Sequence, residues 1–312
     1  MFLRTKAIPA VIGISAFLTA SLVSLASEPF DLSPEQSARP RTEKDPSLIA
    51  SIPARFNFVE DGAFTVGIAP GGTPPIATYA TDAATVVGAD PDIAQLIADK
   101  LGRKLNLAAV AWEDWPLGLA SGKYDAVISN VGVTEERKLK FDFSSYRQGL
   151  HGFYVKVDSP ITSIKEPKDI AGLRIITDAG TIQEKIMVEW NRLNVEAGLK
   201  PAEIIYLDDT AASSLAIRSG RADAIFSMNS VQAYQAALTG ETRSVGTVNA
   251  GWPLTTDVGV VTKKDSGIAD AITAALNETI KEGTYAKALA RWSLSSEQIA
   301  QSRTNPPGLK KY

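Results

Sequence analysis

The stretch SGKYDAVIS, residues 121–129, decides the fold because the chain repeats its pattern as SGRADAIFS at residues 219–227. Each copy has Ser-Gly, a basic residue, one further residue, Asp-Ala and an apolar run that ends in serine. A short apolar run that follows a glycine-terminated helix predicts a buried strand. Strand and helix patterns alternate around both copies, so each half of the chain is predicted to be a β-α-β-α-β unit.

Two such units predict an α/β protein with two similar lobes. Each lobe should be a mostly parallel sheet flanked by helices, with right-handed crossovers. We assign residues 56–150 together with 255–312 to lobe one and residues 151–254 to lobe two, with crossovers near Gly149–Phe153 and Pro253–Val258. The ligand cleft is expected between the lobes.

The segments at both ends of the chain are predicted to lie outside the packed core. Residues 27–55 are rich in Pro, Ser and charge, which predicts an extended or disordered lead-in, with packing from about Phe56 onward. The final stretch, TNPPGLKKY, is predicted to fray.

The N-terminus reads as a targeting segment. Arg4 and Lys6 precede an apolar stretch at residues 7–25, and Ser24 and Ala26 have the spacing that a signal peptidase accepts. We therefore predict a signal peptide at residues 1–26, cleaved after Ala26, and export to the bacterial periplasm. A retained membrane anchor is the alternative, although small and hydroxyl residues dilute the apolar run.

Composition excludes several classes of function. The formal net charge is -3, and no basic block alternates with aromatic residues, so nucleic acid is not an expected partner. The chain has no cysteine, which excludes disulfides, thiol nucleophiles, Cys-based metal sites and a lipid-acceptor cysteine.

Two segments leave predicted strand ends, where open parallel sheets bind their ligands. In SNVGVTEER, the planar guanidinium of Arg137 suits a carboxylate, although a surface arginine fits the same charge run. In DAGTIQE, Thr181 and Glu184 form a capping-box pattern after Gly180, which predicts either an anion site or a plain helix cap. Trp112, also at a strand end, is predicted either as a pocket wall or as a core residue.

The chain resembles the family-3 bacterial extracellular solute-binding proteins, the polar amino-acid receptors of ABC importers. The pieces that carry the resemblance run in order from residue 64 to residue 292: FTVGIAP, GADPDIAQLIADKLG, WEDWPLGLASGKYDAVISNVGVTEERKLKFDFS, DIAGLRIITDAGTIQE, SGRADAIF, VGVVTKKD and EGTYAKALARW. The resemblance implies the type II periplasmic-binding-protein fold and a monomer that closes on a small carboxylate ligand. It further implies delivery to an inner-membrane permease, with no cofactor, metal or catalytic residue.

The family's ligand contacts can be carried onto this chain residue by residue. The resemblance implies that Arg137 binds a carboxylate and that Trp112 forms an aromatic wall. The remaining contacts that it implies are, in chain order, Ser129, Asn130, Gly132, Gly180, Thr181, Ile182 and Gln183.

One departure from the family pattern concerns the ligand's amine. The family's ammonium-binding aspartate falls on Met228, which is followed by Asn229, and we keep both in the expected site. An unpaired buried ammonium is costly. Either the ligand carries a substituted amine, as in opine-like or N-acylated compounds, or another acid replaces the aspartate; the candidates are Asp82, Glu113, Asp114, Asp178 and Asp257.

Two further functions compete with the importer receptor. The first is a dehydratase-like cleft enzyme of the same fold, but a chain with His151 as its single histidine and no cysteine offers no nucleophilic pair. The second is a soluble receptor that serves a sensor kinase. We expect a receptor and not an enzyme.

Overall fold

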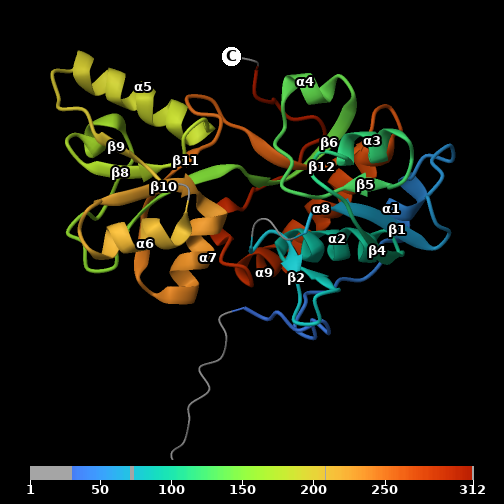
Figure 1. The fold of residues 1–312 in the computed structure, drawn as a ribbon. Helices are drawn as coiled ribbons and strands as arrows, with labels where there is room; N and C mark the ends of the chain where they lie inside the picture. The colour runs from blue at the N-terminus through green and yellow to red at the C-terminus, as the bar shows by residue number, and fades with distance from the viewer. Residues whose placement is uncertain (1–29, 71–73, 208, 311–312) are drawn as a thin grey trace, which may run out of the picture.

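The computed structural model describes residues 30–70, 74–207 and 209–310. The predicted signal peptide lies outside these residues. The chain forms two lobes, each built around one five-stranded sheet (Figure 1). Within the described residues, no helix has the length and apolarity needed to cross a membrane.

Lobe one contains the sheet β4-β1-β5-β12-β6. Strands β4, β1 and β5 are parallel, whereas β12 runs antiparallel to both of its neighbours. The strands of lobe one are β1 (Ala63–Ile68), β4 (Lys104–Ala109), β5 (Ala126–Val127), β6 (Phe141–Gln148) and β12 (Asp257–Lys263), with a small hairpin of β2 (Thr78–Tyr79) and β3 (Val86–Val87). Its helices are α1 (Pro46–Ser51), α2 (Ala89–Lys100), α3 (Trp115–Ala120), α4 (Glu135–Lys138), α8 (Ile268–Glu282), α9 (Thr284–Ala290) and the 3-10 turn η2 (Ser295–Glu297).

Lobe two contains the sheet β11-β7-β10-β8-β9. Here β10, β8 and β9 are parallel, and β7 runs antiparallel to both β10 and β11. The strands of lobe two are β7 (Leu150–Lys156), β8 (Arg174–Thr177), β9 (Glu203–Tyr206), β10 (Ala224–Met228) and β11 (Thr242–Asn249). Its helices are η1 (Pro167–Ile170), α5 (Ile182–Glu196), α6 (Thr210–Arg218) and α7 (Asn229–Thr239).

The antiparallel strands are the ones that pass between the lobes. Strand β6 ends at Gln148 in one sheet, and β7 begins at Leu150 in the other. The return runs from Asn249 at the end of β11 to Asp257 at the start of β12. Each sheet therefore contains three parallel strands, as the predicted β-α-β-α-β unit requires, together with the crossover strands. The antiparallel pairing of the crossover strands was not predicted from the sequence.

The aspartates in the two copies of the repeat form equivalent hydrogen bonds. Asp125 accepts the backbone N–H of Thr65 at 2.7 Å, next to the start of β1. Asp223 accepts the backbone N–H of Arg174 at 2.8 Å, at the start of β8. In each lobe this aspartate holds the repeat strand against its parallel neighbour, so the shared sequence pattern encodes strand pairing.

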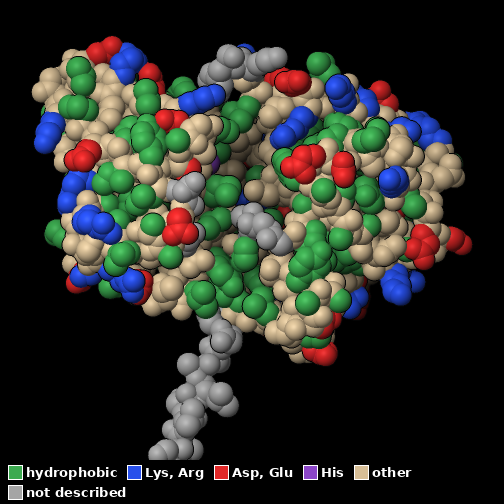
Figure 2. Space-filling model, in the orientation of Figure 1, with side chains coloured by type: hydrophobic (Ala, Val, Ile, Leu, Met, Phe, Trp, Pro, Cys, Tyr) green, Lys and Arg blue, Asp and Glu red, His purple; other side chains and the backbone are tan. Residues whose placement is uncertain are grey.

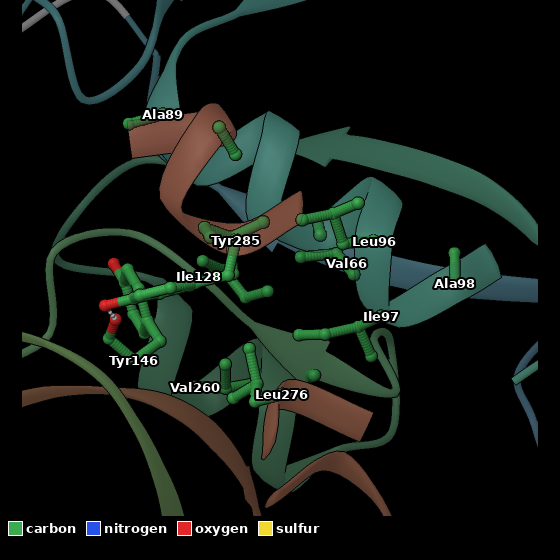
Figure 3. Close-up of a cluster of buried hydrophobic side chains, with 14 of the residues drawn as sticks. Val66, Ala89, Leu96, Ile97, Ala98, Ile128, Tyr146, Val260, Leu276 and Tyr285 are labelled. Carbon is green, nitrogen blue, oxygen red and sulfur yellow. Dashed lines mark hydrogen bonds between the residues drawn. The ribbon is translucent and has the colours of Figure 1, made fainter. Parts of the chain in front are cut away.

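The lobe-one core lies between the sheet and helices α2 and α8. Figure 3 shows Leu96 of α2 close to Val66 of β1, and Leu276 of α8 close to Val260 of β12. All four side chains are fully buried. Lobe two has its own core, in which Phe153 and Phe226 of the sheet stack on each other and Trp190 of α5 stacks on Phe153.

The lead-in differs from its prediction because its described part is anchored to the lobes. Phe30 is buried and stacks on Tyr234 of α7 and on Trp292, which follows α9, at ring-centroid distances of 4.4 and 6.0 Å. Arg39 forms an ion pair with buried Asp92 at 2.7 Å. Residues 46–51 form α1. The prediction from polar composition was wrong for this part of the lead-in, because the residues that it packs against are distant in the sequence.

The C-terminal tail is also packed along its described part. Leu309 donates its N–H to the carbonyl of Val133 and accepts the N–H of Glu135. Gly308 donates to the carboxylate of Glu135 at 2.7 Å. The tail therefore lies against the start of α4 and is not frayed there, because backbone pairing holds it.

Candidate functional site

The space between the lobes is the candidate site. Figure 2 shows a hollow at the centre of the molecule, between the lobe that carries α5 and the lobe that carries α4. The ends of β5 in lobe one and of β8 and β10 in lobe two lead into the segments that were predicted to bind a ligand.

At the lobe-one strand end, Ser129 and Asn130 are held in fixed positions. The hydroxyl of buried Ser129 accepts the backbone N–H of Ala69 at 3.0 Å. Asn130 has a positive φ of 52°, and its N–H donates to buried Asp90 at 2.8 Å. Its side-chain oxygen accepts a hydrogen bond from Arg147. Both predicted residues lie at the strand end, and both side chains have protein partners.

Arg137 has a half-buried guanidinium whose hydrogen-bond acceptor within the described residues is a backbone carbonyl. The Thr134 hydroxyl caps α4 by accepting the N–H of Arg137 at 3.1 Å. The Arg137 side chain then turns back and donates to the carbonyl of Gly132 at 2.8 Å. In the described part of the chain it forms no ion pair, and burial lowers the pKa of Arg137 from its ordinary value. The remaining N–H donors of its planar fork are therefore available to an anion.

Two indole rings frame this guanidinium. The Cζ atom of Arg137 lies 5.8 Å from the ring centre of Trp112 and 6.0 Å from that of Trp115. Trp115 is buried, whereas Trp112 is 42% exposed. Trp112 is therefore a surface residue and not a core residue. A Cβ added to Gly132 would meet open space, so this side of the site has room.

The N-terminus of α5 provides the matching surface of lobe two. The Thr181 hydroxyl accepts the N–H of Glu184 at 3.2 Å, as the capping pattern predicts. The carboxylate of Glu184 instead reaches the N–H of Gly180, at 2.6 Å, where φ is +74°. The first-turn N–H groups of an α-helix have no intrahelical acceptor, so those of Ile182 and Gln183 are available to an anion.

The side chains at this helix end have different roles. Ile182 is 40% exposed and reaches the space between the lobes, whereas Gln183 is buried. The Thr181 hydroxyl also donates to the carbonyl of Asp178 at 2.7 Å. At this helix end, lobe two therefore presents mainly backbone N–H groups and the apolar side chain of Ile182 to the space between the lobes.

The end of β10 differs from the expectation. Asn229 is buried, and its amide donates to Glu297 at 2.8 Å and to Ser296 at 3.2 Å. Its oxygen accepts the Tyr154 hydroxyl at 2.9 Å. These contacts occupy the Asn229 side chain, so in this structure it connects the lobes and does not face a ligand. Met228 is half-buried and lies opposite His151 in the strand register.

A buried polar network joins the two strand ends, and sequence reasoning missed it. Arg147 of β6 forms a hydrogen bond with Asn130 and an ion pair with Glu297, and Glu297 accepts a hydrogen bond from Asn229. The side chains of Arg147 and Glu297 are 2% and 1% exposed. The network therefore connects lobe one to lobe two beside the crossover strands.

The acids that could replace the ammonium-binding aspartate differ in their exposure and in their hydrogen-bond partners. Asp82 accepts the N–H groups of Ala84 and Thr85 in an exposed turn. Glu113 and Asp114 are exposed next to Trp112. Asp257 pairs with Arg303 at 3.3 Å. Within the described residues, the carboxylate of Asp178, which follows β8, accepts the Ser227 hydroxyl at 3.3 Å.

A groove of about 730 Å³ extends the site between α4 and α5. Its apolar lining comes from both lobes, the return crossover and the tail. The lining residues include Thr134, Ile182, Ile186, Trp252, Pro253 and Leu309. The contributions of the crossover and the tail could not be read from local patterns, because they depend on how the chain returns to lobe one.

Residues 64–295 match the bacterial extracellular solute-binding proteins, family 3. The chain belongs to this family. It is 31% identical over 168 residues to the L-cystine-binding protein TcyJ of Escherichia coli (strain K12), a match that covers 53% of this chain and 59% of TcyJ. It is 26% identical over 251 residues to the L-cystine-binding protein TcyA of Bacillus subtilis (strain 168), covering 80% and 85% of the two chains.

The solved structures of similar proteins confirm the type II periplasmic-binding-protein fold of this family-3 chain. The L-cystine solute receptor of Neisseria gonorrhoeae, in its unliganded open conformation, superposes with a TM-score of 0.65. The superposition covers 81% of this chain and 99% of the receptor, at 22% sequence identity. Within the described residues, no group of three or more His, Asp or Glu side chains could hold a metal ion.

Proposed function

We propose that this family-3 protein is an exported receptor of an ABC importer that captures an amino acid, or a carboxylate derived from one, by closing its lobes. The observation that carries the proposal is the half-buried guanidinium of Arg137, framed by Trp112 and Trp115 and without a carboxylate partner in the described part of the chain. The amino-acid names of the relatives agree with a carboxylate ligand.

The mechanism uses contacts to both lobes. Arg137 donates to the ligand's carboxylate from lobe one. The first-turn N–H groups of Ile182 and Gln183 donate from lobe two when the crossover strands bend and the lobes approach. A ligand that contacts both lobes binds the closed state more tightly, so it shifts the population toward that state. The closed form is then the one that the permease recognises.

The direct test is calorimetric titration of the processed protein with the twenty amino acids and with N-acylated and opine-type conjugates. Replacement of Arg137 by alanine should lower the affinity for the best compound by a factor of at least about 100, since a bidentate charged pair exceeds the ~1.5–3 kcal/mol of one charged hydrogen bond. Arg137→Lys should also bind poorly, because one ammonium cannot reproduce the fork. Lys138→Ala, next in the chain, is the matched control and should bind normally.

The result that would contradict the proposal is near-native affinity of the Arg137→Ala variant. Recovery of the ligand with a changed chemical structure after incubation would instead favour a cleft enzyme. If a sensor kinase and not an importer used the protein, deletion of the permease would leave the cellular response to the ligand intact.

Export is proposed separately. Mass spectrometry of periplasmic extract should find a mature chain that begins near Ser27. Recovery of residues 1–26 with the membrane fraction would contradict cleavage.

A further inference from the structure

His151 occupies the edge of the lobe-two sheet that leads into the candidate site. It is the second residue of β7, and the strand register places it opposite Met228 of β10 and Val248 of β11. Met228 is the last residue of β10, so His151 lies at the carboxyl ends of the parallel strands, the edge where α5 begins. Figure 2 shows purple, the colour of the chain's single histidine, within the hollow between the lobes.

The ring of His151 lies on the face of the sheet that α5 covers. Directly opposed residues of two strands point to the same face, so His151 and Met228 share it. The His151 ring meets Phe226 edge-on, with centroids 5.8 Å apart. Phe226 stacks on Phe153, which stacks on Trp190 of α5. His151 is therefore the polar residue at the cleft end of an otherwise aromatic layer.

Both ring nitrogens of His151 lack hydrogen-bond partners within the described residues, although the residue is only 5% exposed. Buried polar atoms in native proteins nearly always have a partner, so a group of this kind calls for a ligand or a bound water. Burial lowers the pKa of His151 to about 4. At neutral pH the imidazole is therefore uncharged, with one N–H donor and one acceptor nitrogen.

The surroundings of His151 do not favour a cationic ligand group. Met228, its direct neighbour on this face, is apolar. Glu297 is engaged by Arg147 and Asn229. Asp178 contacts Ser227, which precedes Met228 and so points to the opposite face of β10. A neutral group that both donates and accepts a hydrogen bond matches the imidazole better, and an amide is such a group.

We propose that His151 contacts the ligand directly, exchanging hydrogen bonds with an amide group of the bound compound. This inference rests on the proposed function, because His151 would contact a second group of the same ligand whose carboxylate Arg137 binds. The amide can belong to a side-chain carboxamide or to an acylated amine, since both present an N–H and a carbonyl oxygen. His151 then supplies specificity, while Arg137 supplies the carboxylate anchor common to both ligand types.

The test uses four defined probes in calorimetric titrations. L-glutamine carries a side-chain carboxamide, N-acetyl-L-alanine carries an acylated amine, and L-glutamate and L-arginine carry no amide. We expect one of the two amide probes to bind at least about tenfold more tightly than both non-amide probes. The amide probe that binds more tightly shows whether the ligand's amide is a side-chain carboxamide or an acylated amine. His151→Leu should remove this preference, because leucine keeps the apolar volume and eliminates both nitrogens.

Two measurements separate a ligand contact from a structural role. The matched control is Trp190→Phe, which also removes an unpartnered buried N–H in the same layer, but away from the strand ends; it should keep the amide preference. In ¹⁵N NMR, the single histidine should show both ring-nitrogen signals shifting when the preferred amide probe binds. Urea unfolding should find His151→Leu at least as stable as the wild type, so lost binding would not reflect unfolding.

Three outcomes would overturn the inference. They are tightest binding of L-glutamate or L-arginine, an unchanged amide preference in His151→Leu, and ring-nitrogen signals that do not move on binding. In each case the proposed function still stands if Arg137→Ala abolishes the binding that is observed. Failure of all four probes to bind would count against the inference alone, because the proposed function is tested with the full set of amino acids and conjugates.

Discussion

The two copies of the repeat share a scaffold and differ in the chemistry at their ends. Asp125 and Asp223 fix their strands through equivalent backbone hydrogen bonds. Near the carboxyl ends of these strands, lobe one presents the cation of Arg137, whereas lobe two presents Met228 beside the neutral ring of His151.

This difference shows which positions the fold constrains. The aspartates and the apolar run must satisfy strand pairing and core packing, so both copies retain them. Residues farther from the strand, such as Arg137, are free of both constraints, so the ligand's chemistry can decide their identity. The buried link between Asn130, Arg147, Glu297 and Asn229 then ties the two unlike ends together.

The largest expected effect on stability comes from removing the ion pair between Arg147 and Glu297 in this buried link. Glu297→Gln would leave the buried guanidinium of Arg147 without its counter-charge, and breaking a buried pair in this way costs about 3–5 kcal/mol. Urea unfolding should show this loss. Glu278→Gln, in an exposed pair with Lys281 at 3.6 Å, is the matched control and should change stability by less than about 1 kcal/mol. Equal effects of the two substitutions would mean that the link does not stabilise the fold.

A second comparison uses two glycines near the strand ends. In lobe two, a Cβ on Gly152 would lie 2.5 Å from the Tyr154 ring and 2.9 Å from the Asn229 oxygen. Gly152→Ala should therefore cost about 1–3 kcal/mol through overpacking. In lobe one, Gly132→Ala meets open space and should stay within about 0.5 kcal/mol. Thermal unfolding of both variants measures the contrast, which would disappear if the lobe-two edge could relax.

The third prediction gives the lobe-two end a negative charge, opposite in sign to that of Arg137. Met228→Asp places a carboxylate at the end of β10, where the residue is also the N-cap of α7, a position that favours aspartate. Affinity for amino acids with a free ammonium should rise about tenfold, or about 1.4 kcal/mol. Met228→Leu is the control and should show no gain. Calorimetry that finds equal affinities in the two variants would place Met228 away from the ligand's amine.

The smallest effect is a difference in titration between the repeated aspartates. The Arg174 side chain lowers the pKa of Asp223 below its ordinary value, whereas burial raises that of Asp125. The contribution of Asp223 to stability is therefore present at neutral pH and is lost as the pH falls through its lowered pKa. That of Asp125 is present in acid and is lost as the pH rises through its raised pKa. Carboxyl ¹³C NMR should give a lower midpoint for Asp223, and the reverse order would refute this assignment.

The sequence by itself determined the two lobes and the places where a ligand-binding surface could form. The repeat at residues 121–129 and 219–227, the flanking helices and the glycines that end them are local patterns, so they could be read along the chain. The same holds for the cap formed by Thr181 and Glu184 and for the position of Arg137 after a strand end. Local patterns predict these features because the atoms involved are a few residues apart.

Only the tertiary structure decided which side chains are free. It placed Asn229 in the link to Glu297 and packed Phe30 between Tyr234 and Trp292. It also left the nitrogens of His151 without partners beside Met228 within the described chain. These outcomes depend on residues up to about 260 positions apart, such as Phe30 and Trp292, that the crossovers bring together. No local pattern encodes them, because a polar side chain becomes a ligand contact or a structural link according to which distant partner satisfies it.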